Sequence, residues 1–177
     1  MSRVRRILTL AAGLTVATVV VGEIVARFGL GLGTPPLSMV HPTIEYLFRP
    51  DQDVSRFGNR QAYNAQGMRS GPIPEEGRVA LVIGDSVVNG GTLIDQDDLA
   101  TEIVARQSRE VGAPVYVGNV SAGSWGPSNQ LAWLEEFGTF RAEDVVLVLS
   151  SHDAGDVPTF LPLDPATSLS IPRRTRW

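Results

Sequence analysis

Ser86 is the residue in this sequence with the clearest capacity for chemistry. It follows Gly84 and Asp85 at the end of the apolar run VALVI (79–83), within the stretch VALVIGDSVVNGG. A serine at a turn from a strand into a helix exposes its hydroxyl beside free backbone N–H groups, which suits a nucleophile whose product is an oxyanion. Gly84 permits the tight turn, and Asp85 could cap the helix or hold a neighbouring loop. The same residues would also serve simply as a helix cap, so the triplet alone leaves both interpretations open.

Two further apolar runs also end in small polar residues. NVSAG (119–123) follows the first of them and SSHD (150–153) the second. In parallel sheets, ligands bind beyond the carboxyl ends of the strands. If the three runs are neighbouring parallel strands, their polar ends meet at one edge and form a site in outline.

The elements that must position these residues alternate between strand and helix. Continuous β-branched and aliphatic runs predict buried strands, and periodic apolar residues with suitable ends predict helices. The expected strands are 79–83, 114–121 and 144–151, and the expected helices are 99–111 and 127–138. This order favours an α/β fold with a parallel sheet covered by helices and right-handed crossovers.

Apolar side chains at helical spacing predict the faces that the two helices bury. In the first helix these are Leu99, Ile103, Val104 and Val111; in the second they are Leu131, Leu134 and Phe137. Trp133 and Phe137 lie four residues apart and are expected in the core. Trp125, in the loop after the second strand, could line a glycan or acyl pocket. Trp177 has no predicted place.

The three polar strand ends resemble the conserved blocks of the SGNH (GDSL-like) hydrolase family over roughly residues 60–160. The resemblance implies a three-layer flavodoxin-like fold, with VALVIGDSVVNGG as the first block, VGNVSAGSWGPSNQ (117–130) as the second and LVLSSHD (147–153) as the third. The upstream YNAQGMR (63–69) also looks like the lead-in of many exported members.

The same resemblance assigns roles to single residues. Ser86 is then the nucleophile, and its N–H, a glycine N–H and the side chain at position 152 form the oxyanion hole. Gly123 is the expected glycine and Gly126 the alternative. A histidine N–H can donate to an oxyanion as an amide does, so His152 could replace the family's asparagine; alternatively, it is a polar strand-end residue. The supporting residues are Gly84, Asp85, Asn119 and Asp153.

The family's fourth block, Asp-x-x-His, has no counterpart here. The only histidines are His41 and His152, and neither follows an aspartate by three residues. His41 is expected to be a linker residue. His152 could act as the base only if it reached Ser86, and could not then easily serve the oxyanion. Either the chain is a truncated form of a longer enzyme, or the scaffold has become non-catalytic. We favour truncation because the strand sequences before this point look intact.

The amino terminus predicts an uncleaved signal anchor, with a cleaved signal peptide or an amphipathic or buried soluble helix as the alternatives. Arg3, Arg5 and Arg6 precede the apolar run 7–22, and no convincing Ala-x-Ala cleavage site follows. Basic residues before the segment place the amino terminus in the cytoplasm and the remainder in the periplasm or outside the cell. The expected organisation is an anchor at 1–30, a linker with one or two short strands at 31–77, and a partial SGNH-like domain at 78–177.

Composition excludes several classes of function. The chain has no cysteine, which removes disulfides, thiolate metal sites and a cysteine nucleophile, and its net charge of −4 is unsuited to nucleic acid. We expect no metal and no organic cofactor. The sequence therefore predicts a membrane-anchored ester hydrolase or O-acyltransferase that forms a seryl ester on an acylated small molecule or glycan. The alternative is an inactive binding or scaffold module.

Overall fold

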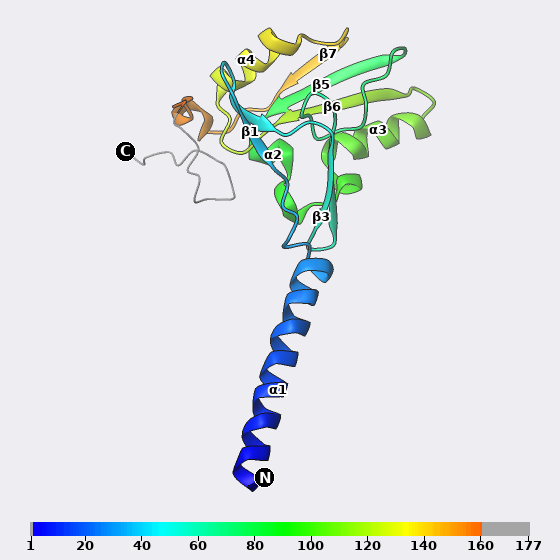
Figure 1. Ribbon diagram of the computed structural model, residues 1–177. Coiled ribbons are helices and arrows are strands. Elements are labelled where there is room, and N and C mark those ends of the chain that lie inside the picture. The colour runs from blue at the N-terminus through cyan, green and yellow to red at the C-terminus, as the bar shows by residue number, and fades with distance from the viewer. Residues whose placement is uncertain (1, 161–177) are drawn as a thin grey trace.

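A long N-terminal helix stands apart from the rest of the chain as a stem (Figure 1). The structure, a computed structural model, describes residues 2–160. The helix α1 (Arg3–Ile24) continues into a π-helical turn η1 (Val25–Gly29), and none of their residues is buried. Together they are long and apolar enough to cross a membrane, which confirms the expected N-terminal apolar helix.

The threonines of α1 satisfy their own polar groups. The hydroxyls of Thr9, Thr15 and Thr18 each donate to the carbonyl four residues earlier, at 2.7–3.0 Å. Such internal bonds allow threonine to sit in an apolar environment without an unmatched donor. The side chains that interrupt the apolar run therefore do not oppose its insertion into a bilayer.

Two antiparallel hairpins connect the stem to the main sheet. The first pairs β1 (Ser38–His41) with β2 (Glu45–Phe48), and the second pairs β3 (Gln52–Arg56) with β4 (Asn59–Tyr63). The sequence predicted one or two short strands between residues 31 and 77. The structure has four there, so the prediction gave too few. The prolines at 35, 36 and 42 lie outside the paired residues, so they do not remove a ladder hydrogen bond.

We call residues 31–160 the head. A three-stranded parallel sheet forms its centre. Its order is β6-β5-β7, with β5 at Arg78–Gly84, β6 at Val115–Ser121 and β7 at Asp144–Leu147. The crossover helices are α3 (Ala100–Glu110) and α4 (Pro127–Phe137). Four short helical turns complete the head: α2 (Ser86–Asn89), η2 (Gly91–Leu93), η3 (Gln96–Asp98) and η4 (Asp153–Gly155). The predicted strand–helix alternation and parallel sheet are confirmed at this level.

The main core lies on one face of the sheet, between α4 and the first hairpin. Alternate residues of β5 (Val79, Leu81 and Ile83) are buried there, as the period of two in a strand requires. They pack with Tyr46 and Trp133 in one apolar cluster. Trp133 and Phe137 are in contact, with ring centroids 5.1 Å apart, which confirms their expected place in the core.

Trp125 belongs to this core rather than to an open pocket. It is only 2% exposed, and its indole Nε1 donates to the carbonyl of Tyr46 at 3.0 Å. Its predicted part in lining a glycan or acyl pocket is therefore wrong. A buried indole needs an acceptor for its N–H, and the first hairpin, which sequence analysis did not resolve, supplies it.

Three predicted burial patterns were wrong in detail. The strand expected at 144–151 ends at Leu147, and Val145, Val146 and Leu147 are 46–52% exposed because β7 is an edge strand. The face of α4 that is buried carries Asn129, Gln130 and Trp133, and Leu131 is exposed. In α3 the buried residues are Thr101 and Ala105; Val104 is exposed, as is Val111 at the end of the helix. The prediction is confirmed for Leu99, which is 2% exposed, and for Leu134 and Phe137, which pack against the core. Apolar spacing therefore located both helices but only part of the side that their neighbours cover.

Candidate functional site

Ser86 and Asp85 have different roles at the start of α2. Asp85 is the N-cap, and its Oδ1 accepts from the N–H of Val87 at 2.8 Å. Ser86 is exposed, and its hydroxyl forms no hydrogen bond within residues 2–160. Asp85 therefore performs the capping that the sequence had also allowed for Ser86. Since α2 has only four residues, its dipole is small, and any oxyanion would depend on individual N–H groups.

Gly84 is required by close packing at this turn. A Cβ at Gly84 would lie 2.5 Å from the Cγ2 atom of Val88 and 3.2 Å from the carbonyl oxygen of Val148. The absence of a side chain therefore lets the first turn of α2 fold back against β5, next to the end of β7.

The end of β6 is tied to the same turn by buried amides. Asn119 is fully buried, and its Nδ2 donates to the carbonyl of Val88 at 2.8 Å. The Ser121 hydroxyl donates to Oδ1 of Asn119, and Nδ2 of Asn89 donates to the carbonyl of Ser121 at 3.2 Å. Polar groups removed from water must find partners, and here the partners join β6 to α2.

The end of β7 reaches the same place through Asp153. Its carboxylate accepts from the Ser150 N–H at 2.8 Å and from the Ser150 hydroxyl at 2.7 Å. Burial opposes its ionisation, but the hydrogen bonds from Ser150 and the nearby His152 outweigh burial and lower the pKa of Asp153. Asp85 and Asp153, both predicted as supporting residues, lie near each other. The ring of His152 is exposed and forms no hydrogen bond within the described chain; the His152 carbonyl accepts from the Gly155 N–H at 3.0 Å.

The two candidate glycines for the oxyanion hole differ in what their backbone N–H groups do. Gly126 is buried, and its N–H donates to Oδ1 of Asn129 at 3.0 Å as part of the cap of α4. Gly123 is only half-buried, and its N–H makes no hydrogen bond within residues 2–160. Gly123 therefore retains a donor for a ligand, whereas Gly126 does not.

The backbone brings the three strand ends to a common edge. Gly84 pairs with Ser121, Ile83 pairs with Leu147, and the Val148 N–H donates to the Ile83 carbonyl at 2.8 Å. Around this edge the supporting polar side chains are buried and bonded, while those of Ser86 and His152 are exposed and make no hydrogen bonds to any residue from 2 to 160. His41 lies elsewhere: its Nδ1 accepts from the N–H groups of Thr43 and Ile44, and its ring lies near Phe137.

Sequence analysis did not identify the role of Arg69 beside this site. Arg69 is completely buried. Its Nη1 donates to the carbonyls of Asn89 and Gly91, and its Nη2 to the carbonyl of Ile94, all at 2.6 Å. The Asn89 carbonyl lies at the end of α2, and the carbonyls of Gly91 and Ile94 belong to the segment that follows it. Burial lowers the pKa of Arg69, and the three acceptors compensate the loss of water.

The sequence feature that could have pointed to the role of Arg69 is the segment YNAQGMR (63–69), which ends at this residue. Oδ1 of Asn64 accepts from the N–H groups of Gln66 and Met68, and Gly67 has a φ of 71° where a Cβ would lie 2.5 Å from the Phe48 carbonyl oxygen. Asn64 and Gly67 thus form a tight turn just before Arg69. The spacing of Asn64, Gly67 and Arg69 is therefore explained by the structure of this turn, independently of the family resemblance.

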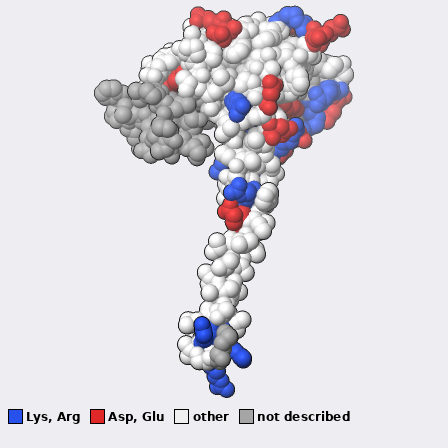
Figure 2. Space-filling view, viewed as in Figure 1, with Lys and Arg blue, Asp and Glu red and all other residues white. Residues whose placement is uncertain are grey.

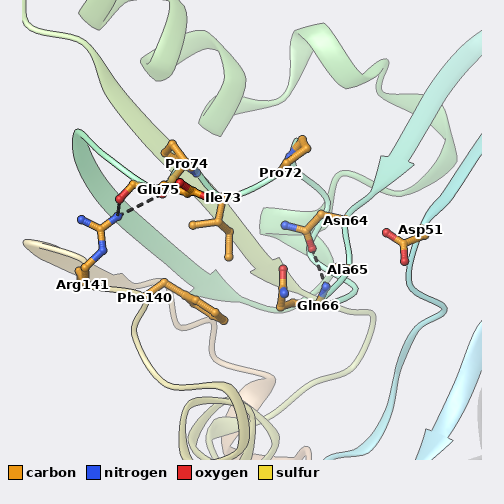
Figure 3. Close-up of a pocket in the computed structure, with 10 residues that line it drawn as sticks. All are labelled: Asp51, Asn64, Ala65, Gln66, Pro72, Ile73, Pro74, Glu75, Phe140 and Arg141. Carbon is orange, nitrogen blue, oxygen red and sulfur yellow. Dashed lines mark hydrogen bonds between the residues drawn. The ribbon is translucent and has the colours of Figure 1, made fainter.

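One groove of the head is lined by residues that do not include Ser86 (Figure 3). It has a volume of about 680 Å³ and lies near the amino ends of the strands, where Ile73 and Phe140 form apolar walls. Nη2 of Arg141 is held by the carbonyls of Pro74 and Glu75 at 3.1 and 2.6 Å. None of its lining residues is a serine or a histidine, so we do not place the chemistry there.

Comparison of the chain with protein-family models and with curated protein sequences found no match. Among residues 2–160, no group of three histidine, aspartate or glutamate side chains could hold a metal ion. The case for a function therefore depends on the geometry at the carboxyl edge of the sheet.

Proposed function

We propose that the protein is an ester hydrolase or O-acyltransferase of the SGNH type, with its three-layer fold and with Ser86 as the nucleophile. One observation carries this proposal. At the edge shared by three strands, Asp85, Asn119 and Asp153 are buried and bonded, whereas the Ser86 hydroxyl is exposed and forms no hydrogen bond within the described chain. The hydrogen bonds of these buried residues fix the backbone around Ser86 and leave its hydroxyl available for reaction.

The proposed chemistry is acyl transfer through Ser86. Its Oγ attacks the carbonyl carbon of an ester, and the negative charge on the former carbonyl oxygen is met by the N–H groups of Ser86 and Gly123 and by the ring of His152. Collapse of this intermediate breaks the bond between the carbonyl carbon and the alcohol oxygen. The released alcohol takes up the proton that the Ser86 hydroxyl lost, and an acyl ester remains on Ser86. Water or an acceptor hydroxyl then removes the acyl group.

The proposed location follows from the stem. We infer that α1 anchors the protein, with Arg3, Arg5 and Arg6 in the cytoplasm and the head in the periplasm or outside the cell. An ester substrate on that side would be an acylated small molecule or an acylated glycan. Membrane extraction at alkaline pH tests the anchor separately from the chemistry, because release into the soluble fraction contradicts it.

A fluorophosphonate probe tests the nucleophile directly. We expect labelling of the full chain in detergent, its loss in Ser86→Ala, and its retention in Ser128→Ala. Ser128 is a matched control, because it is also an exposed serine in the first turn of a helix. Without a paired base the labelling will be slow, since losing triad members costs a serine hydrolase roughly a million-fold in turnover. Equal labelling of wild type and Ser86→Ala would overturn the proposal.

Two substitutions at His152 separate an oxyanion donor from a general base. His152→Asn keeps an N–H donor but cannot accept the serine proton, whereas His152→Ala removes both functions. If His152 stabilises the oxyanion, His152→Asn should label far faster than His152→Ala. Equal loss of labelling in the two variants would make His152 the general base instead.

The second candidate is a binding module that uses the same edge as a ligand pocket. It is favoured by the histidine content, because the chain has two histidines and His41 is occupied in the first hairpin. Absence of labelling in protein that keeps the near-ultraviolet circular dichroism of buried Trp125 and Trp133 would support this candidate over the enzyme.

A further inference from the structure

The turn of the second hairpin lies beside the top of the stem. The Phe57 N–H donates to the carbonyl of Leu30 at 2.8 Å, and a Cβ at Gly31 would lie 2.0 Å from the carbonyl oxygen of Ser55. The backbones of the two segments are thus in direct contact, as the position of β3 above α1 also suggests (Figure 1). The position of turn 56–58 along the axis of the stem is therefore fixed by its contact with the end of the stem.

The length of the stem determines the depth at which turn 56–58 lies when the stem crosses a bilayer. A hydrocarbon core of about 30 Å needs about 20 helical residues, and such a span that begins at Ile7 ends at Ala26. Arg27, whose guanidinium binds Glu23 at 2.8 Å, and Phe28 then follow at the headgroup level. On the face shown in Figure 2, charged groups lie at the free end of the stem and next to its junction with the head, and none lies between them. The acidic residue near the upper end of the span, Glu23, is paired with Arg27.

The side chains at this level are aromatic and basic. Phe28 is 78% exposed and Phe57 is 44% exposed, although both are large apolar groups. The Cζ atom of Arg56 lies 5.2 Å from the centre of the Phe57 ring. A ring beside a guanidinium suits the membrane interface, where the ring enters the glycerol region and the cation meets lipid phosphate.

The turn also has an unfavourable residue for its conformation. Phe57 and Gly58 both have positive φ, 54° and 83°, and they connect the paired residues Arg56 and Asn59. A two-residue turn of this kind strongly prefers Asn-Gly, because a bulky residue is strained at positive φ. The presence of phenylalanine where asparagine would fold better indicates that the ring serves something other than the turn.

We propose that turn 56–58 is a membrane-contact element, in which Phe57 inserts into the lipid interface and Arg56 binds the phosphate of anionic lipids. It holds the head at a fixed height on the bilayer surface. The inference rests on the anchor proposed above but does not depend on the chemistry of Ser86.

Spin labels on single cysteines test this inference, because the chain contains no cysteine of its own. The labelled variants are Val16→Cys in the stem, Ser55→Cys beside the turn and Val111→Cys on the head. Each full-length protein is reconstituted in vesicles of phosphatidylcholine and phosphatidylglycerol. Collisions with oxygen, which enters the bilayer, are compared with collisions with a water-soluble nickel complex.

The expected oxygen-to-nickel ratio is highest at position 16, lowest at 111 and several-fold above the 111 value at 55. If position 16 is exposed to nickel, the anchor itself is wrong. If 16 is protected but 55 equals 111, only the membrane-contact element is wrong. Spin–spin broadening at 55 that grows with protein density would indicate a second copy at the turn and would also overturn it.

Phe57→Asn in the Ser55→Cys background distinguishes lipid contact from a folding role. The substitution suits the turn, so the melting temperature in detergent should stay the same or rise, while the protection of the label at 55 falls toward the 111 value. Arg56→Gln should reduce that protection in vesicles with phosphatidylglycerol but not in pure phosphatidylcholine. Unchanged protection in Phe57→Asn would contradict the proposal.

Discussion

Arg69 shows how one buried side chain can order a loop beside a reactive group. Its guanidinium donates to three backbone carbonyls at the end of α2 and in the segment that follows, and it forms no salt bridge among the described residues. A lysine has a single ammonium with a different geometry and could not serve the carbonyls of Asn89, Gly91 and Ile94 together. The position of that loop therefore depends on arginine in particular.

Arg69→Lys should lower the free energy of unfolding by about 3 kcal/mol, because it leaves buried carbonyls without donors. Thermal unfolding in detergent, followed by near-ultraviolet circular dichroism, measures the loss. Arg78→Lys is the control: Arg78 is exposed, and its bond to Glu143 lies at the surface, so its melting temperature should not change. Equal effects of the two substitutions would contradict the role assigned to Arg69.

Asp153 should make the stability of the head depend on pH. Its folded pKa lies below the unfolded value of about 3.9, so the folded state binds fewer protons and the stabilisation is present above that pH. We expect Asp153→Asn to cost about 1–3 kcal/mol at pH 7. The difference from wild type should shrink as the pH falls below about 4. Unfolding by urea over this range measures it; a difference that grows in acid would reverse the sign argued here.

At the scale of elements, the N-terminus of α4 and the turn η4 are packed without space between them. A Cβ on Gly126 would lie 1.8 Å from the carbonyl oxygen of Asp156 and 3.1 Å from that of Asp153. Gly126→Ala must displace the segment that carries Asp153, at a cost of about 1–3 kcal/mol. Gly155→Ala in the same turn meets nothing within 4 Å and should leave the melting temperature unchanged. A silent Gly126→Ala would show that the two elements do not pack in this way.

The elements that sequence analysis predicted correctly are those whose signals are local. The continuous apolar run in β5, and the proline and glycine that begin and end α4, identify their structures without reference to distant residues. The hairpins were under-predicted because Phe57-Gly58 lacks the asparagine that usually marks such a turn. The buried face of α4 was misplaced because the first hairpin supplies the partners of Asn129, namely the Ile44 carbonyl at 2.6 Å and the Glu45 carboxylate at 3.2 Å.

The same distinction applies to the candidate site. Ser86, Gly123 and His152 could be proposed because each follows an apolar strand. The role of Arg69 could not, because its acceptors lie 20 or more residues further along the chain. The choice between Gly123 and Gly126 also needed the structure, since only the hydrogen bond to Asn129 shows which N–H is already used.

At the scale of the whole molecule, the β7 edge of the central sheet is the feature of the head that we expect to favour association. Within the described chain, β7 pairs on one side with β5, and Val145, Val146 and Leu147 are about half exposed. An apolar strand with unpaired N–H and C=O groups is a template for another strand. The head should therefore self-associate through β7 as its concentration rises.

Val146→Lys tests this expectation with little risk to folding. Because Val146 is 49% exposed, the substitution should change stability by no more than about 0.5 kcal/mol. The charge on the edge strand should nonetheless reduce association, as measured by sedimentation of the full chain in detergent over a range of concentrations. Val111→Lys adds the same charge at a residue that is 78% exposed, away from the sheet edge, and should associate like wild type. If both lysines reduce association equally, net charge rather than the β7 edge controls it.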